Sequence, residues 1–550
     1  MTTGNAGLKV QGREIAENTA RAMWMREYIP EALPPEILQR IGGRKNSSSA
    51  FGERMRMRLA DLLAAPESFT PDYTKRYTEL SRYAGDLTPH QAYAMTNLFG
   101  LDSARGYKEL PSDKKFSFPD DDRPQFEYQV GWHFFVGNVF DTQGREYGIQ
   151  LMFWRYALLP PKMAEEAGLT DLENQIVEVH LAVSSAGRRH YRIRPVIVAG
   201  TTGLIDFSTE PYRYSVGKHC ISSQSKDSLF PLRLQAWGVD NHEEVPAEIS
   251  IDITVSQTKG YVLNGDEGML PSCGGVGTLY YSVPNLRVDT NLSRLSIEGE
   301  EISLAGGKFW YDNQWGTGFM PSGSPRSEVL RAAGMLEDKP GVGWDWMEVQ
   351  FDNDTELALS SIHTKEQKEF VMQTGPLPPG IMTAPAVGSF IQQNGSYFPI
   401  KAMMKVTGWV QSFVTDGPYL TTRAWYPNRV EITVETAEVP EGCRRFVMIP
   451  IVLTGQHGFF AAGAEYSEGA VRIESPDGKR IGSGFLENVS YADACRQNLR
   501  LAGIPDTPEN AELFAKPAIP GELKAAAAAF LMKPENAAKL AAELANCRGL

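Results

Sequence analysis

The chain has 550 residues, of which 42% are hydrophobic and 22% are charged, and its formal net charge at pH 7 is −13. This composition is typical of a globular protein and excludes wholesale disorder, and the length predicts about two to four domains. A nucleic-acid-binding protein normally carries a basic face, so the acidic balance argues against a nucleic-acid partner.

The cysteines and the N-terminal region bear on the compartment. The five cysteines are scattered and never spaced as CxxC, which predicts free thiols in a reducing environment. The N-terminal stretch has no uninterrupted apolar core, and the sequence has no run of about 18 apolar residues. We therefore expect no secretory signal and no transmembrane segment, and we expect the protein to be cytoplasmic.

The first region, residues 1–115, is predicted to be helical. Residues 51–66 repeat apolar side chains at helical spacing, and residues 88–100 open with Thr88 as a cap and Pro89 at the first helical position. The stretch 110–125 is polar, acidic and contains prolines, so it predicts a domain boundary.

From about residue 126 the pattern becomes strand-like. Residues 128–140 and 145–158 flank the tetrapeptide DTQG, which predicts a β-hairpin. Further strand-like runs lie at residues 174–185, 190–200, 229–239, 248–258, 277–288, 343–352, 355–364, 398–412, 429–436, 444–454 and 470–475. Many short strands separated by turn residues predict sandwich or barrel domains, which we place at residues 126–330 and 331–505.

The last region, residues 506–550, is rich in alanine and is interrupted by Pro534. It predicts a helical tail that either packs on the rest of the chain or joins copies of it in a homo-oligomer. We assign no chemistry to this tail.

Common cofactor and metal motifs are missing from the sequence. The eight histidines do not occur in HExxH or HxH spacing, so we expect no metal site. The glycine-rich stretch 273–277 lacks the Lys-Ser/Thr of a phosphate-binding loop, and neither a GxSxG elbow nor a dinucleotide fingerprint is present. We therefore expect no cofactor.

Residues 306–316 (GGKFWYDNQWG) place one acid, Asp312, in a row of aromatic rings. Read as a strand, the stretch divides between one face with Trp310, Asp312 and Gln314 and another with Phe309, Tyr311 and Trp315. Such an acid either turns outward to water, pairs with a cation such as Arg155, or lies in apolar surroundings. In the last case desolvation raises its pKa, and the carboxyl group can donate a proton near neutral pH.

Three other segments carry aromatic side chains beside polar ones. In residues 341–354 one strand face bears Trp344, Trp346, Glu348 and Gln350. Residues 422–435 contain Trp425 and Tyr426, and the first hairpin contains Trp132, His133, Gln150 and Trp154. Large aromatic side chains commonly fill the space between sheets. The alternative for these residues is that they contact a ligand.

Taken in order and spacing, six segments resemble the lipocalin-like superfamily that contains carotenoid 1,2-hydratase, AttH-type proteins, kievitone hydratase and the fungal decalin-forming Diels–Alderases. The segments are residues 131–155, 277–288, 306–316, 343–351, 424–432 and 468–491. The D-x-x-WG and GWDW motifs are the most specific of them, and the resemblance covers about residues 126–495.

The resemblance implies a mainly β protein with two lipocalin-like β-barrel or sandwich domains packed together, and a hydrophobic ligand bound between or within them. In carotenoid hydratases, an acidic residue two positions after a tyrosine in this segment is the proposed proton donor to an alkene. The corresponding acid here is Asp312. Trp310 occupies the tyrosine position and Tyr311 is adjacent, which is a departure from the family pattern.

We therefore expect an enzyme that acts on a hydrophobic unsaturated small molecule, such as an isoprenoid, steroid-like or polyketide compound. The expected reaction is acid-assisted hydration, dehydration or isomerisation of a C=C bond. Asp312 is the expected acid, and Tyr311 and Gln314 are the other expected catalytic residues. The expected substrate-binding residues are Trp310, Trp315, Trp344, Trp346, Trp425, Trp132, Gln150 and Trp154. A cofactor-free cyclase or pericyclase and a lipophile carrier without catalysis stay open as alternatives.

Overall fold

The computed structural model describes residues 107–491. Gaps within this range lie at residues 109, 112–113, 158–160, 162–164, 166–169, 194–195, 201–202, 241–245, 266, 273–275, 318–342, 364–366, 368–376, 412–424, 453–457, 462–463 and 490. The predicted helices at residues 51–66 and 88–100 and the Ala-rich tail lie outside the described residues. Within the described part, no helix has the length and apolar character needed to cross a membrane.

The described part of the chain is mainly β-strand, as the sequence predicted. The first sheet contains β1 Val130–Asp141, β2 Glu146–Ala157, β3 Gln175–Ser185, β4 His190–Arg192, β5 Val196–Ala199, β6 Ile205–Thr209, β7 Tyr212–Val216, β8 His219–Ser223, β9 Leu232–Asp240, β10 Ala247–Gln257, β11 Val262–Leu263, β12 Met269–Ser272, β13 Val276–Val288, β14 Arg294–Ile297, β15 Glu300–Ile302 and β16 Leu304–Gly316. The second contains β17 Trp344–Phe351, β18 Glu356–Ile362, β19 Met382–Ile391, β20 Tyr397–Gln411, β21 Trp425–Val434, β22 Arg445–Pro450, β23 Gly458–Ala461, β24 Ala464–Glu474 and β25 Arg480–Val489. Two short 3-10 helices are η3 Asp120–Asp122 and η6 Glu441–Cys443.

The predicted hairpin at the start of the β region is present as β1 and β2. Their connection closes because the Asp141 carboxylate accepts hydrogen bonds from the backbone N–H groups of Gln143 and Arg145 at 2.9 and 2.8 Å. Gly144 adopts a φ of 78°, a left-handed conformation that favours glycine. The hairpin then positions β1 in the middle of the sheet, between β2 and β16.

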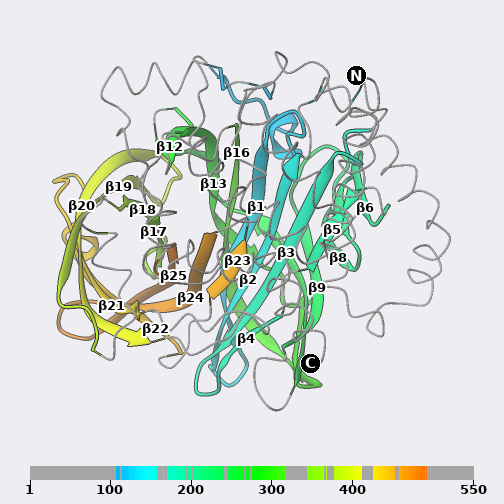
Figure 1. Ribbon diagram of the computed structural model, residues 1–550. Coiled ribbons are helices and arrows are strands. Elements are labelled where there is room, and N and C mark those ends of the chain that lie inside the picture. Colours follow the sequence, from blue (N-terminus) through cyan, green and yellow to red (C-terminus); the bar gives the residue numbers. More distant parts are fainter. Residues whose placement is uncertain are drawn as a thin grey trace, which may run out of the picture.

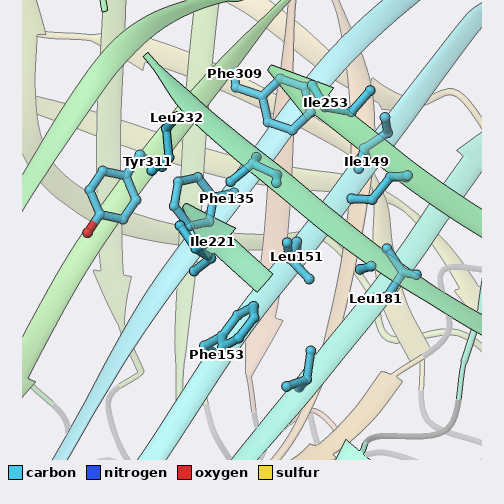
Figure 2. Close-up of a cluster of buried hydrophobic side chains, with 14 of the residues drawn as sticks. Phe135, Ile149, Leu151, Phe153, Leu181, Ile221, Leu232, Ile253, Phe309 and Tyr311 are labelled. Carbon is cyan, nitrogen blue, oxygen red and sulfur yellow. The ribbon is translucent and has the colours of Figure 1, made fainter. Parts of the chain in front are cut away.

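The first sheet curls around a single hydrophobic core. Its main path runs β4-β3-β2-β1-β16-β13-β10-β9-β8-β7-β6, and every pairing in it is antiparallel. Side chains from distant parts of this path, such as Phe135, Leu181, Ile221 and Leu232, meet in the core drawn in Figure 2. The curl also brings β4 to β9, where the Arg192 N–H donates to Asp240 at 3.2 Å. One face of the sheet is therefore filled by its own core.

The second sheet closes on itself. Strands β17 to β22, followed by β24 and β25, pair in sequence, and β25 pairs again with β17, so these eight strands form an antiparallel barrel. Its interior is a second hydrophobic core that includes Met347, Ile432 and Leu486. The sequence did not predict β19, because Pro385 and Gly388 resemble turn residues. Pro385 fits there since the pairing of β19 with β18 begins only at residue 387.

The two sheets pack against each other through a third buried layer, which we call the interface. It lies between β1, β2 and β16 of the first sheet and β17, β24 and β25 of the barrel (Figure 1). The approach is close at Gly148, where an added Cβ atom would lie 2.1 Å from the Cβ of Ala470. Among the described residues, ion pairs that cross the boundary include Lys259 with Glu356 and Arg480 with Glu146, each at 2.6 Å, and Lys308 with Asp354 at 2.7 Å.

Candidate active site

Asp312 lies at the interface, on the central strand β16 of the first sheet, with only 4% of its surface exposed. Strand β16 pairs with β1 on one side and β13 on the other, and Ser282 of β13 is directly opposite Asp312. One carboxylate oxygen accepts the Tyr280 hydroxyl at 2.6 Å, and the other accepts the Trp310 indole N–H at 2.6 Å together with the Ser282 hydroxyl. All three donors are neutral, so the acid is held without a cation.

Burial controls the protonation of this acid. Desolvation raises the pKa of Asp312 to about 7, although the hydrogen bonds from Ser282, Tyr280 and Trp310 act in the opposite direction. Arg155, the cation considered from the sequence, donates instead to the carbonyl oxygens of Tyr128, Gln125 and Val130 and to the Gln175 side chain. A buried carboxyl group with this pKa can act as a proton donor near neutral pH.

The barrel reaches the acid through Trp346 of β17. Its indole N–H donates to the Tyr280 hydroxyl at 3.0 Å, so Tyr280 connects Trp346 to Asp312. The Trp346 ring also meets Trp310 edge to face at 6.3 Å between ring centroids and Phe134 at 5.8 Å. The predicted face of β17 is therefore the one that meets the first sheet.

Three further acids lie at the interface near Asp312. They are Glu348 of β17, Glu468 of β24 and Glu487 of β25. Burial, followed by the charges of Asp312 and Glu356, raises the pKa of Glu348 well above its ordinary value. For Glu468 burial again dominates, and the other three acids add to it. Burial and the charge of Asp312 raise the pKa of Glu487 to about 8.

From the sequence, Glu348 was predicted only as part of a strand face, and Glu468 and Glu487 were not predicted as site residues. A signal was present, because each acid occupies a position in the two-residue period that is otherwise apolar. Glu468 lies between Tyr466 and Ala470 in this period, and Glu487 lies between Phe485 and Val489. This signal shows that an acid is buried only when it is also known that another sheet covers that face of the strand.

Most of the predicted aromatic and polar residues share the interface with Asp312. Trp132 and Trp154 are cross-strand neighbours whose rings stack with centroids 4.6 Å apart. Gln150 donates to the Tyr466 hydroxyl of the barrel at 3.0 Å. Gln314 lies two residues beyond Asp312 on the same face, where its amide donates to Thr278. Trp344 lies at the partly exposed edge of this layer, beside Glu487.

Three predicted residues are not brought to Asp312. Tyr311 and Trp315 lie on the other face of β16, inside the core of the first sheet, and Figure 2 shows Tyr311 there beside Phe135. Strict alternation along the strand separates them from the acid, even though Tyr311 is its neighbour in sequence. Trp425 belongs to β21, which lies on the far side of the barrel from β17. We therefore leave these residues out of the proposed site.

Tyr311 belongs instead to a second buried polar network. Its hydroxyl lies 2.7 Å from Nδ1 of His133 and 3.5 Å from the hydroxyl of Tyr281, which in turn donates to Asp122 at 2.6 Å. Burial raises the pKa of Asp122 to about 7 and lowers that of His133 to about 3. This network occupies the opposite face of the strands that carry Asp312, and it provides a natural control for experiments on that acid.

Neither network is arranged as a metal site. Among the described residues, no group of three or more histidine, cysteine, aspartate or glutamate side chains is placed to hold a metal ion.

The fold and the site define a protein of two packed antiparallel β-units with a buried acid between them. A model of the AttH-like family matches residues 109–491, and the chain belongs to this family. A solved structure described as AttH from Nitrosomonas europaea is 17% identical, with a TM-score of 0.50, over 70% of this chain and 99% of that chain.

Two other solved structures are also similar. Kievitone hydratase from Nectria haematococca is 14% identical, with a TM-score of 0.43, over 70% of this chain and 96% of that chain. CghA with Sch210972 is 11% identical, with a TM-score of 0.33, over 71% and 97%. No curated protein sequence matches the chain. At these identities the likeness concerns the fold, and the site must be interpreted from its own geometry.

Proposed function

We propose that this protein is an enzyme that uses Asp312 to protonate a C=C bond of a hydrophobic small molecule, such as an isoprenoid, steroid-like or polyketide compound. The observation that carries the proposal is the environment of Asp312. The acid is buried among Trp310, Trp346 and Phe134, and burial raises its pKa to about 7. At neutral pH a large fraction of the carboxyl groups therefore holds the proton needed for donation.

In the proposed step, the π electrons of the alkene take the proton from the Asp312 carboxyl group and form a new C–H bond. Asp312 becomes a carboxylate, and the other alkene carbon gains cationic character. The three donors from Tyr280, Ser282 and Trp310 are already in place to stabilise the negative charge that develops on Asp312. The rings of Trp310 and Trp346 lie beside the acid, and cation–π contact with an aromatic ring would stabilise the cation.

The cation then has two outcomes. Water adds to the carbon and loses a proton, which completes hydration, or a neighbouring C–H bond loses its proton to give an isomeric alkene. In either case the Asp312 carboxylate takes back one proton and the site returns to its starting state. Dehydration is the reverse of the first route, with the acid protonating the departing hydroxyl group.

Deuterium incorporation tests this chemistry directly. The protein is incubated in D2O with a panel of unsaturated isoprenoid alcohols, and mass spectrometry measures deuterium bound to carbon. We expect the wild type to incorporate deuterium and Asp312→Asn to incorporate it at least about 100-fold more slowly. Ligand binding, measured by tryptophan fluorescence, should be unchanged in this variant. Asp122→Asn is the matched control, because Asp122 is also a buried acid of raised pKa but lies on the opposite face.

The alternatives give different results in the same experiment. A cyclase or pericyclase folds the substrate without donating a proton, so it would change the product without carbon-bound deuterium and would tolerate Asp312→Ala. A carrier would return each ligand unchanged. Full activity of Asp312→Asn would eliminate the acid mechanism.

A further inference from the structure

The interface contains buried hydrogen-bond acceptors that no donor among the described residues reaches. In the described part of the chain, both carboxyl oxygens of Glu348 and both of Glu468 have no hydrogen-bond partner, and neither side chain is exposed. The side-chain amide oxygens of Gln150, Gln350 and Asn138 are also buried without a donor. We call these five side chains the acceptor cluster.

Glu348 is directed toward the region of Asp312 by its neighbours on β17. Two residues before it, Trp346 donates to Tyr280, and two residues after it, Gln350 donates to the carbonyl oxygens of Pro284 and Phe309. All three side chains lie on one strand face, so Glu348 faces the part of β13 and β16 between these contacts. That part contains Ser282 and Asp312.

Glu468 is directed toward β2 in the same way. Tyr466 accepts a hydrogen bond from Gln150, and Ala470 contacts Gly148, so the intervening Glu468 faces β2 near these residues. Across the barrel strands, Glu468 is opposite Glu487, which is opposite Trp346. The acceptor cluster thus continues the Asp312 site along the interface.

An acceptor that is buried without a donor destabilises a protein, and native structures leave few of them. Here they are concentrated in one layer, beside an acid to which we assign catalysis. In each of the five side chains of the acceptor cluster the unsatisfied atoms are oxygens, so O–H or N–H groups of a ligand would satisfy them. Burial raises the pKa of Glu348 and of Glu468, which favours hydroxyl groups over a cation, because a hydroxyl group can both donate to and accept from a carboxyl group.

We propose that Glu348 and Glu468, with the amide oxygens of Gln150 and Gln350, form a polar subsite that binds hydroxyl groups of the ligand. This inference rests on the proposed function, because it places the subsite beside the reacting bond. The substrate would then be an unsaturated apolar molecule that also carries hydroxyl groups, and a bare hydrocarbon would bind poorly. Trp344 and Glu487, which are only partly buried, lie at the edge of this layer.

A matched pair of ligands tests the subsite by binding alone. The probes are farnesol and the hydrocarbon that differs from it only in lacking the hydroxyl group, and quenching of tryptophan fluorescence gives each Kd. We expect the wild type to bind farnesol about tenfold more tightly than the hydrocarbon. Glu348→Met and Glu468→Met should lose most of this preference while binding the hydrocarbon as tightly as before.

The control is Glu431→Met, which removes a partly exposed glutamate of β21 and should keep the preference. Ligand-free Glu348→Met and Glu468→Met should melt at the same temperature as the wild type or higher, because an unsatisfied acceptor has been removed. Equal binding of both probes by the wild type, binding of neither, or retained preference in both methionine variants would overturn the subsite. Failure of these variants to fold would also count against it, because it would reveal a structural partner for the carboxyl groups.

The binding experiment can fail or succeed independently of the deuterium experiment that tests the proposed function. Asp312→Asn should keep the preference for farnesol, since Asp312 is already satisfied by its three donors. If that variant keeps both the preference and full deuterium incorporation, the acid mechanism fails and the hydroxyl subsite stands. If the preference is absent but incorporation depends on Asp312, the subsite fails and the acid mechanism stands.

Discussion

Trp346 and Tyr280 join the two β-units beside the buried acid. The Trp346 indole N–H donates to the Tyr280 hydroxyl at 3.0 Å, and the same hydroxyl donates to Asp312 at 2.6 Å. The barrel therefore contributes to the environment of the acid without contributing the acid itself. The protonation of Asp312 depends on how the two units pack, and this dependence can be measured.

Turnover should depend on pH through Asp312. Its folded-state pKa is raised from 3.8 to about 7, so the acid form required for donation predominates below pH 7 and is lost above it. We expect kcat to fall about tenfold for each pH unit above 7. Tyr280→Phe removes a hydrogen bond that lowers the pKa of Asp312, so the alkaline limb should move to higher pH. The plateau should also fall about tenfold, because the developing carboxylate loses a donor.

Tyr281→Phe is the control for this pH profile. Tyr281 is adjacent in sequence but lies on the opposite face, where it donates to Asp122. Its substitution should leave the alkaline limb of kcat in place. If the alkaline limb shifted equally in both variants, the pH dependence of kcat would reflect a general destabilisation of the sheet and would not reflect the titration of Asp312.

The buried ion pair between Lys259 and Glu356 should be important for stability. Lys259 donates to Glu356 at 2.6 Å and also to the carbonyl oxygens of Asp354 and Gln392, and both charged side chains are buried. Lys259→Met leaves the carboxylate uncompensated, which should lower the free energy of unfolding by about 3–5 kcal/mol in urea denaturation.

The double variant Lys259→Met/Glu356→Gln should recover part of this loss, because the charge that lacked a partner is gone. The exposed pair Lys405 with Glu431 provides the comparison, and Lys405→Met should change the free energy of unfolding by less than about 1 kcal/mol. A loss of similar size at both sites would contradict the importance assigned to burial.

The close approach of the two units at Gly148 predicts a compensating pair. Gly148→Ala places a methyl group where the Ala470 side chain lies, and should destabilise the protein by about 1–3 kcal/mol. Turnover should fall as well, because the added methyl group forces the interface apart near Asp312. Combining Gly148→Ala with Ala470→Gly should restore both quantities.

Gly306→Ala serves as the control in chemical denaturation. Gly306 belongs to β16, the strand that carries Asp312, but no atom lies within 4 Å of an added Cβ there. Its free energy of unfolding should change by less than about 0.5 kcal/mol. If Ala470→Gly does not rescue Gly148→Ala, the two units do not approach each other as described.

Much of the fold was predictable because strands carry a local signal. The two-residue period of residues 306–316 assigned Trp310, Asp312 and Gln314 to one face, and the structure confirms this division. The hairpin around DTQG was predictable for the same reason, since its turn chemistry lies within five residues. The bounds assigned to the two domains stay predictions, although a change of sheet does occur between β16 and β17.

The sequence by itself determined that an acid lies among aromatic rings and which side chains share its strand face. Only the tertiary structure decided that this face meets the barrel, that Tyr311 and Trp315 belong to a separate core, and that Glu348, Glu468 and Glu487 come close to Asp312. The physical reason is that alternation is a property of neighbouring residues. Burial depends on which distant strand covers the face, and that follows from the packing of the first sheet against the barrel.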